Sequence, residues 1–257
     1  MDRFLNKIIC GDNVDIMKQM PDNCINLTVT SPPYDDLRKY NGYNFDFPTT
    51  AQELFRVTKH GGVVVWVVND KTVNGSETLT SFKQALYFKD IGFNLHDTMI
   101  YAKSSYMPLT HNRYEQQFEY MFILVKHKLE TWNPIMVECL TYGTKRNRRS
   151  SKANETTYAE RKREGKTIVN RLKQHGNIFY YNVGKNDKTA HNAPFPEQLA
   201  HDHIISWSNE GDIVFDPMCG SGTTCKMAKL LKRNYVGIDC SHEYVDISNN
   251  RLNELTG

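Results

Sequence analysis

The stretch Gly211-Asp212-Ile213-Val214-Phe215-Asp216-Pro217-Met218-Cys219-Gly220-Ser221-Gly222-Thr223-Thr224 is the most organised part of the chain. It predicts an apolar strand, a glycine turn and a helix that runs to Lys232, and a second strand follows at Tyr235–Asp239. Glycines at such a turn let a ligand approach the backbone at the helix N-terminus. Asp239, 19 residues after Gly220, is placed to bond ribose hydroxyls. The pattern therefore predicts a site for an adenosine-type cofactor.

Two details separate this turn from a dinucleotide site. The Gly220-Ser221-Gly222 turn lacks the third glycine of the G-x-G-x-x-G pattern. Asp216 also puts a negative charge at the strand end, where it would repel a phosphate but attract an ammonium or sulfonium group. A nicotinamide-dependent oxidoreductase is disfavoured on these grounds and stays an alternative interpretation.

Strands for the rest of the sheet are expected upstream, because only 18 residues follow Asp239. Short apolar runs alternate with helical patterns, which predicts an α/β fold with a mostly parallel sheet. The expected strands are Lys7–Cys10, Ile25–Thr30, Val63–Val68 with Trp66 in the core, Thr98–Ala102 and Tyr120–Val125. The expected helices are a segment ending at Met20, Thr50–Lys59 closed by Gly61-Gly62, Leu79–Lys89 and Pro196–Trp207. Ligands bind at the carboxyl ends of parallel strands, so Asp12, Ser31, Asp216 and Asp239 should share one edge.

A second motif, Thr30-Ser31-Pro32-Pro33-Tyr34, directly follows the strand Ile25–Thr30. The two prolines stiffen the backbone and fix the direction of the neighbouring carbonyls. An amine held there would donate to the Ser31 hydroxyl and the Pro32 carbonyl, which leaves its lone pair available for attack. Tyr34 offers a flat face on which a base removed from a duplex can stack. A rigid turn with a packed tyrosine is the alternative interpretation.

Together, Thr30–Tyr34 and Phe215–Thr224 resemble the S-adenosylmethionine-dependent DNA amino-methyltransferases of the permuted β class, in which the catalytic motif precedes the cofactor motif. The resemblance covers residues 5–125 and 188–253. It implies a Rossmann-like methyltransferase fold with a mixed, mostly parallel, circularly permuted seven-stranded sheet and an inserted target-recognition region. The implied parts are residues 1–127 with the catalytic motif, 128–187 as the target-recognition insertion and 188–257 with the cofactor motif.

The resemblance also implies roles for individual residues. Asp216 would hold the amino group of the methionine moiety, Asp239 the ribose and Asp12 the adenine amino group. The family usually has His-Pro where this chain has His191-Asn192. The implied catalytic residues are Ser31, Pro32, Pro33 and Tyr34. The implied cofactor-binding residues are Asp12, Asn13, Ser31, Asn192, Phe195, Pro196, Asp216, Met218, Gly220, Ser221, Gly222, Thr223, Asp239 and Cys240.

The implied reaction is transfer of a methyl group from S-adenosylmethionine to the exocyclic amino group of a flipped base in double-stranded DNA. In the family, a serine at the start of the catalytic tetrapeptide is associated with cytosine N4, and an aspartate with adenine N6. Ser31 therefore favours cytosine N4, with adenine N6 as the alternative. A cognate restriction endonuclease and a second copy of the chain are candidate further partners.

Charge is concentrated in one segment of the chain. Residues 145–173 hold eleven basic and three acidic side chains, a net charge of +8, while the rest of the chain sums to −5. Such a segment predicts a polyanionic partner, and a non-enzymatic nucleic-acid-binding protein stays an alternative. The expected DNA-binding residues are Arg38, Lys145, Arg146, Arg148, Arg149 and Lys152.

Several classes of protein and site are disfavoured by composition. The longest apolar run, Val63–Val68, is far shorter than a membrane span needs, and the N-terminus lacks the apolar core of a signal peptide. The six cysteines form no C-x-x-C pair, so we expect reduced thiols in a cytoplasmic protein, with no metal and no cysteine nucleophile. His201 and His203 are not expected to bind one metal together, because residues two apart on a helix point to different faces, and both are expected at the surface.

Overall fold

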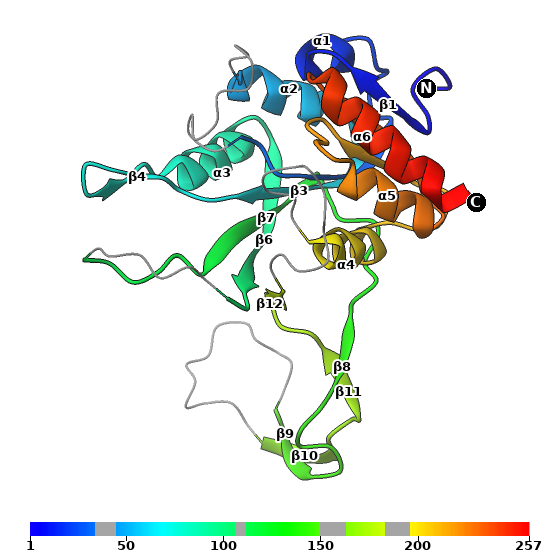
Figure 1. Cartoon of the computed structure of the whole chain (residues 1–257). Coiled ribbons are helices and arrows are strands. Elements are labelled where there is room, and N and C mark those ends of the chain that lie inside the picture. Colours follow the sequence, from blue (N-terminus) through cyan, green and yellow to red (C-terminus); the bar gives the residue numbers. More distant parts are fainter. Residues whose placement is uncertain (34–44, 106–111, 150–162, 183–195, 257) are drawn as a thin grey trace. The chain divides into compact units, whose positions relative to one another are not determined.

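The structure, a computed structural model, describes residues 1–33, 45–105, 112–149, 163–182 and 196–256 (Figure 1). The chain divides into two compact units, residues 1–133 with 177–257 and residues 134–176. Of the helices within these ranges, none combines the length and the apolar character that crossing a membrane requires.

The larger unit is built on one mixed sheet, which has eight strands among the described residues. Their order across the sheet is β1-β14-β13-β2-β3-β7-β6-β12, and β7 alone among them runs antiparallel to its neighbours. The bounds are β1 Lys7–Cys10, β2 Ile25–Thr30, β3 Thr58–Val68, β6 Phe93–Lys103, β7 Phe118–Lys126, β12 Ile178–Tyr181, β13 Ile213–Asp216 and β14 Asn234–Asp239. The last two strands of the chain lie between the first two, so upstream strands complete the sheet as predicted.

The prediction of an α/β fold with a mostly parallel sheet is confirmed, but the expected number of seven strands is wrong. The eighth strand is β12, which pairs in parallel with β6 from Ile178↔Ile100 to Tyr181↔Lys103. Its four residues lie inside the weakly periodic segment 128–187 that the sequence marks as an insertion. Strand β12 is held by backbone pairing at the edge of the sheet, a contact that leaves little trace in the local sequence pattern.

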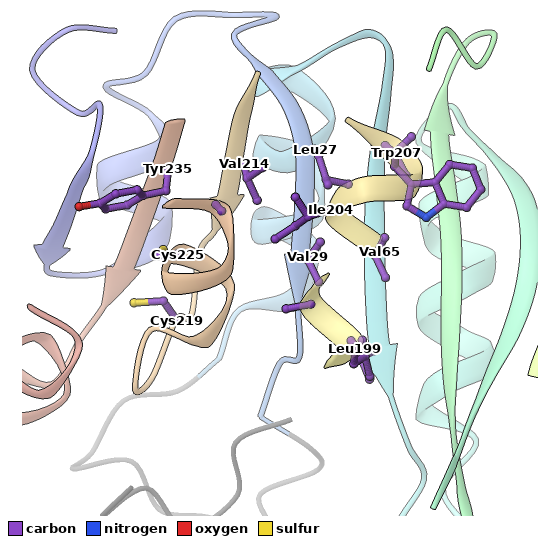
Figure 2. Close-up of a cluster of buried hydrophobic side chains, with 14 of the residues drawn as sticks. Leu27, Val29, Val65, Leu199, Ile204, Trp207, Val214, Cys219, Cys225 and Tyr235 are labelled. Atoms are coloured by element: carbon purple, nitrogen blue, oxygen red, sulfur yellow. The ribbon is translucent and has the colours of Figure 1, made fainter. Parts of the chain in front are cut away.

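Helices cover both faces of the sheet and enclose two apolar cores (Figure 1). One face carries α1 Asn13–Met17, α2 Phe47–Val57 and α3 Thr80–Asp90, and the other carries α4 Glu197–Trp207, α5 Thr223–Leu230 and α6 His242–Asn253. Figure 2 shows Leu199 and Ile204 of α4 among the side chains of β2 and β3. On the opposite face Trp66 is fully buried, which confirms its predicted place in the core, and its indole nitrogen donates to Gln84 Oε1 at 2.8 Å.

The predicted end of the second helix is wrong. Helix α2 ends at Val57, and both Gly61 and Gly62 lie inside β3. A side chain remote in sequence stabilises this early end: the buried Lys126 amine donates to the carbonyls of Phe55 at 2.6 Å and Thr58 at 2.9 Å. The helix therefore stops where its last carbonyls find partners, upstream of the glycines.

Substituting Lys126 by methionine should lower the free energy of unfolding by about 3 kcal/mol, because buried carbonyl groups lose a charged donor. The midpoint of urea denaturation measures this loss. Lys128→Met, at an exposed position two residues on, is the control and should shift stability by less than about 0.5 kcal/mol. Equal midpoints for the two variants would show that the Lys126 amine does not stabilise the end of α2.

The smaller unit consists of two short antiparallel pairs. Strand β8 (Met136–Glu138) pairs with β11 (Leu172–Gln174), and β9 (Lys145–Arg149) pairs with β10 (Arg163–Ile168). The unit lies within the predicted insertion 128–187 and carries part of its basic segment. Its role in target recognition stays a prediction.

Candidate active site

Four neighbouring strands of the larger unit end at one edge of the sheet. Strands β1, β14, β13 and β2 run in parallel, with Cys10 beside Asp239 and Phe215 beside Thr28. The segments that follow these strands therefore leave the sheet on the same side, as expected for a ligand-binding edge. The Thr30 hydroxyl donates to Asp216 Oδ1 at 2.8 Å, which joins the end of β2 to the end of β13. The described parts of the two motifs thus meet at one place.

Asp216 is the most perturbed carboxylate at this edge. Its side chain is 2% exposed, and Oδ1 also accepts from the Met218 backbone amide at 3.1 Å. Burial raises the pKa of Asp216 to about 6, while hydrogen bonds from Thr30, Met218 and Thr224 partly oppose that rise. A carboxylate removed from water in this way gains more from a cationic ligand than an exposed one does.

The glycine turn follows Asp216 directly and begins α5. Gly220 and Gly222 have φ angles of 51° and 77°, and Gly222 is the N-cap of α5. A Cβ atom on Gly222 would lie 2.8 Å from Ser248 Oγ, so both conformation and space require glycine at this position. The Ser248 hydroxyl donates to the Gly220 carbonyl at 2.7 Å. This turn is therefore held by α6 as well as by its own backbone.

The carboxylate of Asp239 is bound to the same turn. Oδ2 accepts from the Gly220 amide at 2.8 Å and Oδ1 from the Ser241 amide at 2.9 Å. Burial raises the pKa of Asp239, and these two backbone bonds lower it. A carboxylate can accept about four hydrogen bonds, so contact with ribose hydroxyls remains compatible with this arrangement. Cys240 follows directly, and its carbonyl lies 3.9 Å from Cys10 Sγ.

Asp12 lies at the edge as predicted, but the structure shows it in another role. Its Oδ1 accepts from the amides of Val14 at 2.9 Å and Asp15 at 3.1 Å, so Asp12 is the N-cap of α1. Asn13 begins that helix and donates to Thr50 Oγ1 at 3.3 Å. A contact between Asp12 and an adenine stays a prediction.

The described part of the catalytic motif is Ser31-Pro32-Pro33. Pro32 is buried, and Ser31 and Pro33 are half-buried. Pro196 is the N-cap of α4, and Lys145 is exposed in β9, which also includes Arg146, Arg148 and Arg149. The predicted residues Tyr34, Arg38, Lys152, Asn192 and Phe195 lie outside the described residues.

A cluster that the sequence did not predict supports the glycine turn. Arg251 Nη1 donates to the Ser221 carbonyl at 2.7 Å and to Thr223 Oγ1 at 3.3 Å, and Nη2 lies 2.7 Å from Glu197 Oε1. Lys226 Nζ contacts the same Glu197 oxygen at 2.5 Å. We call Glu197, Lys226 and Arg251 the turn clamp. Its members come from three helices, so no local motif could have identified it.

The expected surface position of His203 is wrong. Its ring is 2% exposed, Nδ1 accepts from Trp207 Nε1 at 3.1 Å, and Nε2 lies 3.2 Å from Met121 Sδ. Burial lowers the pKa of His203 to about 4. The packing of α4 on the sheet, which helical spacing alone does not reveal, decides this burial. Across the described ranges no group of three or more His, Cys, Asp or Glu side chains could hold a metal ion.

The comparisons with known proteins agree with this geometry. A DNA methylase family model matches residues 25–250. The chain is 54% identical to the orphan methyltransferase M.BamHII of Bacillus amyloliquefaciens, over 92% of each protein. It is 27% identical to the type II methyltransferase M.BglII of Bacillus subtilis, over 96% of this chain and 68% of that protein.

Two solved structures share the fold. The cytosine-N4-specific PvuII DNA methyltransferase matches with a TM-score of 0.71 and 18% identity, over 95% of this chain and 85% of that one. The complex of M1.HpyAVI with S-adenosylmethionine matches with a TM-score of 0.66 and 23% identity, over 96% of this chain and 98% of that one. The family match, the close relative and the shared edge lead to one conclusion: this chain belongs to the DNA methylase family.

Proposed function

We propose that this chain transfers the methyl group of S-adenosylmethionine to the N4 amino group of a cytosine flipped out of double-stranded DNA, at specific sites. The observation that carries the proposal is the hydrogen bond from Thr30 to Asp216. It joins the strand before the Ser31-Pro32-Pro33 corner to the strand before the glycine turn. A methyl donor at the turn and an amine at the corner would therefore be neighbours.

The residues at the turn fit S-adenosylmethionine. The buried Asp216 carboxylate suits the ammonium of its methionine moiety, and Gly220 and Gly222 permit close approach to the backbone. Asp239 suits the ribose hydroxyls, since it ends the strand next to the turn. When bound, this cofactor supplies a methyl group on a positively charged sulfur.

The catalytic motif would position the amine. The Ser31 hydroxyl and the Pro32 carbonyl would accept hydrogen bonds from its two N–H groups. These bonds would direct the nitrogen lone pair away from both oxygens. Proton loss can follow transfer, so no strong base is required. Burial raises the pKa values of the Cys219 and Cys225 thiols, which supports the prediction that neither acts as a nucleophile.

The choice of cytosine rests on Ser31 at the start of the tetrapeptide, and adenine N6 is the second candidate. Incubation of unmethylated DNA with the protein and S-adenosylmethionine, followed by digestion to nucleosides and mass spectrometry, distinguishes the two bases. N4-methylcytosine is expected. N6-methyladenine would overturn the choice of base, and no methylated nucleoside would overturn the proposed function.

The turn clamp should affect cofactor binding more than methyl transfer. Arg251→Lys keeps the charge but loses the planar guanidinium, so we expect the KM for S-adenosylmethionine to rise about tenfold with kcat nearly unchanged. Lys232→Ala, which breaks an exposed ion pair with Glu210, is the control. A fall in kcat at unchanged KM would contradict a positioning role for Arg251.

DNA is the substrate implied by the family. The basic segment, residues 145–173, supports a target-recognition role for the insertion 128–187. Neutralising Arg146, Arg148 and Arg149 together should weaken DNA binding and reduce the log-log salt slope by about 0.9 for each phosphate that these side chains neutralise in the wild type. Fluorescence anisotropy at several salt concentrations measures that slope. An unchanged slope would show that these arginines do not contact phosphates.

We also infer a cytoplasmic location, which the six free cysteines support. A cognate restriction endonuclease and a second copy of this chain remain candidate partners. The relative M.BamHII is described as an orphan methyltransferase and M.BglII as a type II enzyme.

A further inference from the structure

The chain between β6 and β7, which has not been assigned to the site, begins and ends at the same edge of the sheet. Strand β3 is parallel to β2, with Trp66 beside Thr30, and β7 is antiparallel to β3, with Tyr120 beside Val68. Strand β6 is antiparallel to β7 in turn. The end of β6 and the start of β7 therefore lie at the edge where Ser31 follows β2. The described residues that follow β6 and precede β7, 104–105 and 112–117, thus adjoin this edge.

The described end of this connection, residues 112–117, is anchored to its surroundings. Gln116 Nε2 donates to Asn69 Oδ1 at 3.0 Å, just beyond the end of β3. Gln117 Nε2 donates to the Lys103 carbonyl at 3.1 Å, and its own carbonyl accepts from the Lys103 amide at 2.8 Å.

A second anchor lies on the other side of Tyr114. Arg113 Nη2 donates to the carbonyl of Gly75, in the turn between β4 (Thr72–Val73) and β5 (Ser76–Glu77). Side-chain hydrogen bonds from Gln116 and Arg113 thus connect the chain on both sides of Tyr114 to the end of β3 and to this hairpin.

The Tyr114 side chain is fully exposed despite this anchoring. Two aromatic rings at the start of β7 are packed instead: Tyr120 lies 5.4 Å from Phe82 and 5.2 Å from Phe118, measured between ring centroids. A single exposed aromatic ring is not unusual. Tyr114 differs from such a ring in two respects: hydrogen bonds flank it on both sides, and it precedes β7 at the edge where Ser31 follows β2.

We propose that Tyr114 stacks on a base of the DNA substrate beside the site of base withdrawal. This inference rests on the proposed function, because DNA whose target base reaches Ser31 must lie along this edge. A base next to an extruded nucleotide loses a stacking neighbour, and an aromatic side chain can replace that neighbour for any base. Tyr114 is therefore a DNA-binding residue that contributes affinity without reading sequence.

The test compares Tyr114→Ala with Tyr114→Phe and with Leu86→Ala, which removes another exposed apolar side chain, on α3. DNA binding is measured by anisotropy at several salt concentrations, and methyl transfer with tritiated S-adenosylmethionine. Tyr114→Ala should weaken DNA binding and raise the KM for DNA about tenfold. Its salt slope should match that of the wild type, because a tyrosine ring neutralises no phosphate. Tyr114→Phe and Leu86→Ala should behave like the wild type.

Each other outcome has a defined meaning. Unchanged DNA binding in Tyr114→Ala, alongside methyl transfer by the wild type, would overturn the stacking role and leave the proposed function intact. Equal losses in Tyr114→Phe and Tyr114→Ala would assign the effect to the hydroxyl group and also overturn stacking. A wild type that binds DNA but methylates no base would overturn the proposed function and with it stacking beside a withdrawn base, while the binding comparison would still decide whether Tyr114 contacts DNA.

Discussion

Asp216→Asn is expected to weaken binding of S-adenosylmethionine by about two to three and a half orders of magnitude. Asp216 is 2% exposed, so its carboxylate would pair with the cofactor ammonium in a poorly solvated place. Removing one partner of a buried pair costs about 3–5 kcal/mol, and every 1.4 kcal/mol changes affinity about tenfold. Isothermal titration of the two proteins measures the difference.

The pH dependence of cofactor binding offers an independent check on Asp216. Burial raises the pKa of this group to about 6, so the carboxylate becomes protonated and neutral below that pH. Wild-type affinity should therefore fall by about tenfold per unit as pH drops below 6 and stay level above it. Asp216→Asn should show no such step.

The control for both measurements is Asp212→Asn. Asp212 lies just before the other end of β13, where Oδ2 accepts from the Asn209 amide at 2.8 Å. This variant should keep the affinity and the pH profile of the wild type. If Asp216→Asn binds the cofactor as tightly as Asp212→Asn does, the carboxylate has a structural role and the cofactor site lies elsewhere.

Ser31→Ala should reduce the rate of methyl transfer by about 10²–10³-fold while cofactor affinity stays within about twofold of the wild type. The expected loss is that of one positioned hydrogen-bonding group in a preorganised site. Single-turnover transfer of a tritiated methyl group measures the rate, and titration measures the affinity. Ser104→Ala, an exposed position at the same edge, is the control.

The result for Ser31 separates a catalytic corner from a structural one. If Ser31→Ala loses cofactor affinity in proportion to its rate, the corner acts by supporting the neighbouring Asp216 site. A rate equal to that of Ser104→Ala would remove Ser31 from the proposed reaction altogether.

The local sequence pattern was sufficient to predict the principal strands and the two motifs at their ends. Ile25–Thr30 is predicted with its observed bounds, because Ile, Leu and Val alternate with polar residues over six positions, and this period of two is typical of a strand. The C-terminal end of α2 and the edge strand β12 were missed for a common reason. Lys126 stabilises the end of α2, and β6 pairs with β12. Both partners are remote in sequence from the elements that they stabilise.

The order of the motifs, the α/β fold and the resemblance to DNA amino-methyltransferases can be predicted from local sequence, because glycine turns, proline pairs and apolar runs act through neighbouring residues. Which groups meet depends instead on the folded arrangement of strands and helices. Strand pairing brings Thr30 to Asp216 across 186 positions of chain, and helix packing brings Arg251 to the glycine turn. Such contacts depend on how elements assemble in space, and that assembly is the property of the whole sheet and its helices.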